Sequence, residues 1–425
     1  MRRFGRGGGR AGGLRGRRRR SAVRAASAGG VLAALVAGLV AVPVGGLPSA
    51  AADDYQPSVQ AVPVTAQVPW AQNALRFGDL APFVASGSRI KVAVVDSGID
   101  AAAPQLAGAV DVADSVSLVD PSTYPPTADA LGHGTMVAGI IAAHARSGSG
   151  VVGLAPSAVS LLSIRTYKTC ESEDAPIAQG IREAVSRGAK IINVSAGSST
   201  NSPDLASAVR SAQASGVLIV AAAGNLGAQQ DGNPPQYPAA YPGVIAVSAV
   251  GPDRTVTPYS EHGAYVGLAA PGGTADSPLL SVGPANSGTL ASGLGTSFAA
   301  PYVTATAALV WSRYPSLTAA QVRQRLYETA DRMAAGAPDA FYGWGIVDPY
   351  AALTSVSTPA QATTPPPAAP VPLSFAAAPV KQDFTGRALA VGGGGILSAG
   401  GVAGAMWLAR RRRRVMQPPV PAEKL

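Results

Sequence analysis

The sequence predicts an α/β domain whose sheet is mainly parallel and flanked by helices. Short apolar runs typical of buried strands alternate with helical patterns between residues 68 and 355. The first run ends in a carboxylate, Asp96, and functional groups of parallel sheets gather at the carboxyl ends of strands. The chain has 425 residues, of which 47% are hydrophobic, and this is enough for one large domain or two small ones.

The predicted strands are the apolar runs Ile90–Val95, Val159–Ile164, Ile191–Val194, Val217–Ala222 and Val244–Val250. The predicted helices are Thr135–Ala145, Ile177–Arg187 and Pro203–Ala214. Because helical patterns separate the strands along the chain, we expect the strands to run parallel in one sheet.

The N-terminal residues have the pattern of an export signal. An arginine-rich start that ends at Arg20 precedes an apolar stretch over residues 31–44, and the small residues Ala50–Ala52 offer a cleavage site. We therefore expect a signal peptide over residues 1–52 and a short N-terminal extension over 53–67. A disordered basic arm would explain the arginines but not the apolar stretch.

The C-terminal residues predict a membrane anchor. Residues 356–387 are rich in Pro, Ala and Thr and predict a stiff linker. Residues 388–409 carry no charge, and a helix rising about 1.5 Å per residue would reach about 33 Å here, enough to span a bilayer. The arginines that follow predict a basic cytoplasmic tail over 410–425. We expect a single-pass cell-membrane protein with the α/β domain outside the cytoplasm; a flexible tail is the alternative.

The formal net charge of +9 does not indicate a nucleic-acid partner. Residues 53–380 hold 15 Lys and Arg but 22 Asp and Glu, so the excess positive charge lies in the two ends of the chain. A nucleic-acid-binding face needs its cations on the folded domain. We therefore expect no nucleic acid among the partners.

Neither disulfides nor metals are expected. Cys170 is the one cysteine of the sequence, so no intramolecular disulfide can form, and it is interpreted as a small buried hydrophobe or an unreactive thiol. No Asp-rich loop has the spacing of a calcium site. His144, placed in the helical pattern that follows His133, and His262, placed in a loop, belong to no metal-spaced cluster. We expect no cofactor.

Three motifs occur together and in order. Val-Val-Asp-Ser-Gly-Ile-Asp over residues 94–100 delivers Asp96 from a strand into a glycine turn. Gly-His-Gly-Thr-Met-Val-Ala-Gly over 132–139 places His133 at a helix start, and Gly-Thr-Ser-Phe-Ala-Ala-Pro over 295–301 does the same for Ser297. Singly, each could be an ordinary cap or turn. Together they supply a nucleophile, a base that takes its proton, and a carboxylate that orients the base.

These motifs resemble the Asp, His and Ser signatures of the subtilisin family of serine proteases (peptidase S8 type), in that family's chain order. The resemblance covers roughly residues 68–355. It implies a subtilisin-like fold and a serine-type endopeptidase. In that reading Asp96 orients the histidine, His133 is the general base and then the general acid, and Ser297 is the nucleophile.

Two further stretches resemble the binding parts of this family. Asn225, in Ala-Ala-Ala-Gly-Asn over residues 221–225, matches the residue whose side chain donates to the oxyanion; an ordinary turn residue is the alternative. Ser195, Ala196 and Gly197 match the substrate-binding strand, to which an extended peptide adds by main-chain pairing.

The whole arrangement resembles the mycosins, membrane proteases associated with type VII secretion systems. This resemblance implies protein or peptide substrates and membrane subunits of a secretion complex as partners. Mycosins usually carry disulfides, and the lone Cys170 departs from that pattern. The short stretch 53–67 leaves two readings: the enzyme folds without a chaperoning pro-domain, or this stretch packs on the catalytic domain.

Three other functions are alternatives to this one. The chain could be a structural component of a secretion complex whose proteolysis is dispensable, or a general surface-processing subtilase. An acid protease of the sedolisin type would carry a Glu where His133 stands, so His133 argues against it.

Overall fold

The computed structural model describes residues 59–83, 89–168, 176–227, 233–285, 288–333 and 336–356. The chain divides into two units, Met1–Thr358 and Pro359–Leu425, and all the described residues belong to the first. The predicted signal peptide, the linker beyond residue 356, the predicted transmembrane helix 388–409, the basic tail and Cys170 lie outside the described residues. Among the helices of the described ranges, none combines the length and the apolar character needed to cross a bilayer.

Parallel strands form the central sheet of the described domain. Its strands are β2 (Ile90–Asp96), β3 (Val116–Ser117), β4 (Val159–Arg165), β5 (Ile191–Val194), β6 (Leu218–Ala222), β7 (Ile245–Val250) and β8 (Val266–Pro271). They lie in the order β3-β4-β2-β5-β6-β7-β8, and every neighbouring pair is parallel. The predicted α/β fold with a mainly parallel sheet is confirmed.

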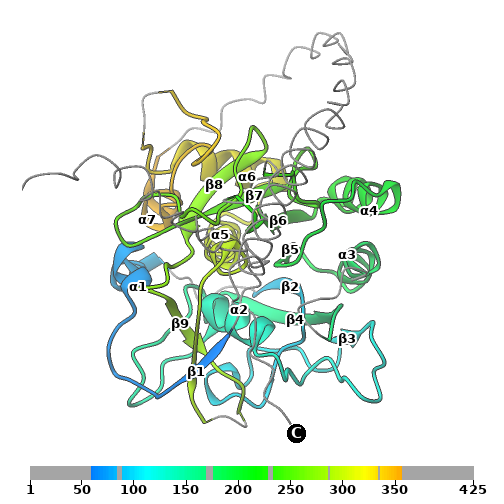
Figure 1. Ribbon diagram of the computed structural model, residues 1–425, viewed down its shortest axis with the longest axis vertical. Helices are drawn as coiled ribbons and strands as arrows, with labels where there is room; N and C mark the ends of the chain where they lie inside the picture. Colours follow the sequence, from blue (N-terminus) through cyan, green and yellow to red (C-terminus); the bar gives the residue numbers. More distant parts are fainter. Residues whose placement is uncertain are drawn as a thin grey trace, which may run out of the picture. The chain divides into compact units, whose positions relative to one another are not determined.

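Helices cover both faces of this sheet (Figure 1). The helices of the described ranges are α1 (Trp70–Ala74), α2 (His133–Ala142), α3 (Ile177–Ser186), α4 (Pro203–Ala214), α5 (Thr296–Arg313), α6 (Ala319–Glu328) and α7 (Pro349–Thr354), with short 3₁₀ turns at Phe77–Asp79, Ala81–Phe83 and Pro104–Leu106. α3 and α4 bury their apolar stripes on one face, while α2 and α5 pack on the other.

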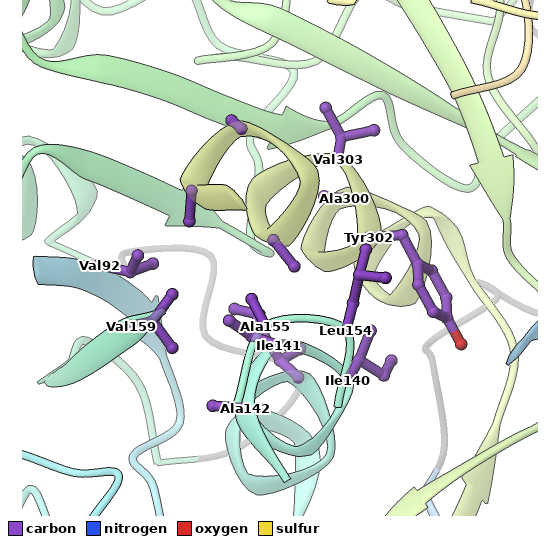
Figure 2. Packing of buried hydrophobic residues seen from close by; sticks show 14 of the residues in the cluster. Val92, Ile140, Ile141, Ala142, Leu154, Ala155, Val159, Ala300, Tyr302 and Val303 are labelled. Atoms are coloured by element: carbon purple, nitrogen blue, oxygen red, sulfur yellow. The ribbon is translucent and has the colours of Figure 1, made fainter. Parts of the chain in front are cut away.

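The helix α5 is the centre of the larger core. Nearly all of its residues are buried, which suits its apolar character around the whole circumference. Figure 2 shows Ile140 and Ile141 of α2 facing Ala300 and Tyr302 of α5. Because both helices begin at the carboxyl edge of the sheet, this packing fixes the positions of their first residues relative to one another.

A second, antiparallel sheet receives the N-terminal extension. The strand β1 (Gln60–Val62) pairs with β10 (Leu290–Gly293), which pairs in turn with β9 (Leu279–Val282). Further along, the N–H of Gly150 donates to the carbonyl of Thr65 at 2.8 Å. The described part of the predicted extension thus packs on the domain, as one of the two readings of 53–67 expected.

Local sequence signals explain several helix starts. Ser202 accepts from the N–H of Leu205 and precedes a proline at the first position of α4. Thr318 and Gln321 form a capping box at the start of α6. α2 begins instead after Gly132, which has a positive φ of 75° and no capping side chain of its own.

The strand predictions agree with the structure within one residue at each end, whereas one helix prediction needs correction. The pattern predicted Thr135–Ala145, but α2 begins at His133 and ends at Ala142, because Ala143 is extended. His144 therefore lies beyond the helix. Its N–H donates to the carbonyl of Gln105 at 2.7 Å, and its predicted place in the helix was wrong.

Candidate active site

The candidate site lies at the carboxyl edge of the parallel sheet, beside β2 and β5. The chain passes from β2 to β4 on one side and later to β5 on the other side of β2. Such a reversal of strand order opens a crevice at the carboxyl ends of the two strands. Asp96 ends β2, Ser195 follows β5, and α2 and α5 start at His133 and Thr296.

Asp96 and His133 form a buried pair. Nδ1 of His133 lies 2.7 Å from Oδ1 of Asp96, and the side chains are 3% and 0% exposed. Oδ1 also accepts from the N–H of Ser97 at 2.7 Å and from the hydroxyl of Tyr167 at 2.8 Å. Three donors on one oxygen hold the carboxylate in one orientation and thereby orient the imidazole.

A second buried carboxyl joins the two motifs that carry this pair. Asp129 accepts from the hydroxyl of Ser97 at 2.9 Å and from the N–H and hydroxyl of Thr135 at 2.9 and 2.8 Å. Burial raises the pKa of Asp129, and the nearby charge of Asp96 acts in the same direction, while the Thr135 and Ser97 donors oppose the shift. Asp129 thus links the turn after β2 to the first turn of α2.

Gly134 allows these two motifs to approach. A Cβ atom at this position would lie 2.0 Å from the carbonyl oxygen of Gly98 and 3.0 Å from Oδ1 of Asp96. Any side chain would push α2 away from the turn that follows Asp96. The glycine of the Gly-His-Gly motif is therefore required by contact.

Opposing effects set the pKa of His133. Burial lowers it, whereas the charge of Asp96, the hydrogen bond to Asp96 and the charge of Asp129 raise it, and the balance lies above the ordinary value of 6.5. Nε2 is buried and has no hydrogen-bond partner among the described residues. That nitrogen is therefore available to take a proton from a neighbouring group.

Ser297 lies in the first turn of α5, and a proline downstream shapes its surroundings. Pro301 has no N–H, so the carbonyl of Ser297, four residues earlier, lacks its usual helical donor. The hydroxyl of Ser195 donates to that carbonyl instead, at 3.0 Å. In the other direction, the hydroxyl of Ser297 donates to the carbonyl of Ser195 at 3.3 Å.

No hydrogen bond joins Ser297 to His133 in this structure, and the serine hydroxyl is bonded to Ser195 instead. The two motifs nevertheless meet: the ring of His133 lies 4.8 Å, centroid to centroid, from the ring of Phe298, the residue after Ser297. Rotation about the Cα–Cβ bond of Ser297 redirects its hydroxyl without any movement of the backbone.

Asn225 is fixed through its side-chain carbonyl. Oδ1 accepts from the N–H of Thr296 at 2.9 Å and from the hydroxyl of Thr296 at 3.0 Å. Both contacts use the carbonyl end of the side chain, so its NH₂ group points away from Thr296. Because Thr296 directly precedes Ser297, this contact places the side chain of Asn225 beside the first turn of α5.

The predicted substrate strand continues β5 past its last sheet residue. Ser195 is buried, Ala196 is half-buried and Gly197 is exposed. Ser198 then forms an antiparallel bridge with Tyr237, with N···O distances of 3.0 and 2.8 Å. The segment is thus extended and becomes accessible along its length, as a peptide-pairing strand must be.

Tyr167, Asp129 and Thr296 contact the predicted site residues but were not among the predicted ones. The strand order makes β4 the neighbour of β2, and Asp96 pairs with Arg165, two residues before Tyr167. An acid four residues before His133, at a helix start without a Ser, Thr, Asp or Asn cap, was a usable signal for Asp129. Nothing in the pattern marked Thr296 as the partner of Asn225.

The remaining candidates carry no site chemistry. Asp100 accepts from the N–H groups of Ala102 and Ala285 and shapes a turn. The ring of His262 stacks on Phe341. Within the described ranges, no three His, Cys, Asp or Glu side chains are grouped to hold a metal ion.

A known protein family matches most of the described domain. The family described as the subtilase family (Peptidase S8) matches residues 87–345. Subtilisin E of Bacillus subtilis (strain 168) is 40% identical over 268 residues, which are 63% of this chain and 66% of the relative, just under two thirds of its length. Subtilisin DY of Bacillus licheniformis is 40% identical over 268 residues, and the match covers 91% of that protein.

Solved structures of mycosins are also similar. MycP1 from Mycobacterium smegmatis shares 29% identity at a TM-score of 0.61, covering 72% of this chain and 90% of that one. The MycP3 protease from the type VII (ESX-3) secretion system shares 29% identity at a TM-score of 0.57, covering 70% and 94%.

The substitution Asp96→Ala separates the burial that lowers the pKa of His133 from the contact with Asp96 that raises it. In the native chain we expect His133 to titrate above 6.5. In Asp96→Ala the burial that lowers the pKa is opposed only by the charge of Asp129, so His133 should titrate below 6.5. NMR titration of the imidazole protons measures both values, and His144 and His262 serve as internal controls. An unchanged His133 titration would contradict the assigned cause.

Proposed function

The chain belongs to the subtilase family of serine-type endopeptidases, and from this membership we propose that it hydrolyses peptide bonds through an acyl-enzyme on Ser297. The observation that carries the proposal is the buried pair of Asp96 and His133, joined at 2.7 Å, with the free Nε2 of the imidazole near the start of α5.

In the proposed reaction the hydroxyl of Ser297 leaves the carbonyl of Ser195 and turns toward Nε2 of His133. The imidazole takes the hydroxyl proton as the oxygen attacks the peptide carbonyl, and Asp96 stabilises the imidazolium. His133 then gives the proton to the departing amine, which leaves an ester on Ser297. Water, activated by the same imidazole, hydrolyses that ester and restores the serine.

Asn225 and the N–H of Ser297 are proposed as the oxyanion donors. Negative charge develops on the peptide carbonyl oxygen during the attack, and fixed N–H groups stabilise it without reorganising. The support is geometric, since Thr296 holds Oδ1 of Asn225 and so leaves the NH₂ end to point elsewhere. Ser195, Ala196 and Gly197 are proposed to pair with the main chain of the substrate.

Replacement of the nucleophile tests the proposal. We expect Ser297→Ala to abolish both covalent labelling by a fluorophosphonate probe and hydrolysis of fluorescein-labelled casein, with an unchanged melting temperature. The control is Ser292→Ala, another buried serine in β10, which should label like the native chain. Equal labelling of Ser297→Ala and the native chain would remove Ser297 from the role.

We further propose that a signal peptide over residues 1–52 exports the chain and that residues 388–409 anchor it as a single-pass membrane protein, with the catalytic domain outside the cytoplasm. The support is the uncharged stretch followed by arginines. Alkaline carbonate extraction should leave the full chain in the membrane pellet, whereas a variant ending at residue 387 should be released into the medium. Release of the full chain by carbonate would contradict the anchor.

A role in type VII secretion is proposed from the likeness to MycP1 and MycP3, whose structures are described as parts of such systems. The exported proteins of native, deletion and Ser297→Ala cells should be compared by mass spectrometry. Proteolytic function predicts that Ser297→Ala accumulates uncleaved substrates. A structural role predicts that Ser297→Ala restores the secretion lost in the deletion strain. A general surface-processing subtilase predicts normal type VII secretion in the deletion strain and in the Ser297→Ala strain.

A further inference from the structure

Glu261 is a buried acid that the proposed reaction does not use. It lies in the segment between β7 and β8, and its side chain is 0% exposed. No Lys or Arg of the described residues forms an ion pair with it. Burial raises its pKa to about 7, while donors from Leu226, Tyr265 and Gln236 act in the opposite direction. Burying a carboxyl group without a cation beside it costs folding free energy, so the contacts that hold Glu261 need an explanation.

The contacts of Glu261 lie on the two sides of Asn225. Its own N–H donates to the carbonyl of Gly224 at 2.9 Å, and its Oε1 accepts from the N–H of Leu226 at 3.2 Å. The residues immediately before and after Asn225 are therefore bound by one amino acid. The N–H of Gly227 adds a bond of 3.0 Å to the carbonyl of Tyr259.

Gly224 brings this backbone directly against the carboxyl group. Its φ is +117°, a conformation that other residues rarely adopt. A Cβ atom there would lie 2.4 Å from Cδ of Glu261 and 2.4 Å from Cγ of Gln236. The close approach shows that Glu261 is packed beneath the turn and does not merely lie near it.

We propose that Glu261 is a positioning residue that holds the turn 224–226 so that the NH₂ group of Asn225 faces the oxyanion. Thr296 fixes the side-chain carbonyl of Asn225, and Glu261 fixes the backbone on either side. Both contacts act on Asn225 and its neighbours, so Glu261 is assigned no direct part in the chemistry. The inference rests on the proposed function, because it gives Glu261 a role only through the oxyanion donor.

Substitution of Glu261 by Gln tests whether the turn is held by the oxygen acceptor of Glu261 or by its negative charge. The amide of Gln keeps an oxygen acceptor for the N–H of Leu226, whereas Ala removes it. We expect Glu261→Ala to lower kcat of the full-length chain on p-nitrophenyl acetate by about 10-fold to 100-fold with little change in KM, below the loss of about 10²–10³ for removing an oxyanion donor outright. Glu261→Gln should keep kcat within about 3-fold of the native value, because the side-chain oxygen of Gln can still accept from the N–H of Leu226.

A double-mutant cycle with Asn225→Ala gives the decisive measurement. If Glu261 acts through Asn225, Glu261→Ala should cost less than about 3-fold once Asn225 is already Ala, because coupled residues are not additive. Equal fold-losses in both backgrounds, a loss confined to KM, or a loss in Glu261→Gln as large as in Glu261→Ala would each overturn the proposal. A neutral Asn225→Ala would do the same, since Glu261 would have no donor to position.

Two controls separate the effect of Glu261→Ala on kcat from its effects on stability and from the proposed function itself. Val322→Ala, in the buried core face of α6, should lower the melting temperature without changing kcat, so a similar loss of stability in Glu261→Ala cannot by itself explain a slower enzyme. Ser297→Ala reports on the proposed function separately. Activity in Ser297→Ala would remove that function, whereas an inactive Ser297→Ala combined with additive Glu261 losses would remove only the role of Glu261.

Discussion

The candidate site depends on the cost of burying a carboxylate and an imidazole together. Taking such a pair out of water costs several kcal/mol per ion unless hydrogen bonds replace the lost hydration. Here the replacement is concentrated on one oxygen, since Ser97, Tyr167 and His133 all meet Oδ1 of Asp96. Each donor comes from a different segment, so the turn after β2, the start of α2 and the segment after β4 must all be in place before the pair is stable. The strand order, which sets β4 beside β2, and the close contact at Gly134 bring these segments together.

A second buried network joins the nucleophile to the sheet. The hydroxyl of Thr304 donates to the side chain of Asn193, whose NH₂ donates to the hydroxyl of Ser195, which donates to the carbonyl of Ser297. Pro301 leaves that carbonyl without a helical N–H, and the hydroxyl of Ser195 supplies a donor in its place. Buried polar groups that are fully satisfied specify one arrangement of the elements that carry them. The network therefore fixes α5 against β5, and with it Ser297 against the proposed substrate strand.

The sequence predicted what depends on local pattern. The buried strands, α3, α4 and the motifs around Asp96, His133 and Ser297 were recognisable because each is a short run with its own periodicity or turn chemistry. Contacts between distant segments were not readable. Tyr167 reaches Asp96 only because β4 lies beside β2, and Thr296 meets Asn225 only because β6 and α5 are packed together. The end of α2 was misplaced because Ala and His continue a helical pattern, whereas Ala143 is extended and the N–H of His144 bonds to Gln105.

The two buried acids Asp96 and Glu261 differ in what faces them, and this difference suits their proposed roles. Asp96 faces an imidazole that becomes a cation during the reaction, so a carboxylate there is matched by opposite charge. Glu261 faces amide groups and the hydroxyl of Tyr265, and its pKa of about 7 makes a neutral carboxyl readily accessible. A negative charge beneath Asn225 would oppose the oxyanion that Asn225 is proposed to stabilise, whereas a neutral acid still accepts the bond from Leu226. Burial without a neighbouring cation favours the neutral form of Glu261. In that form Glu261 can hold the turn around Asn225 without repelling the oxyanion.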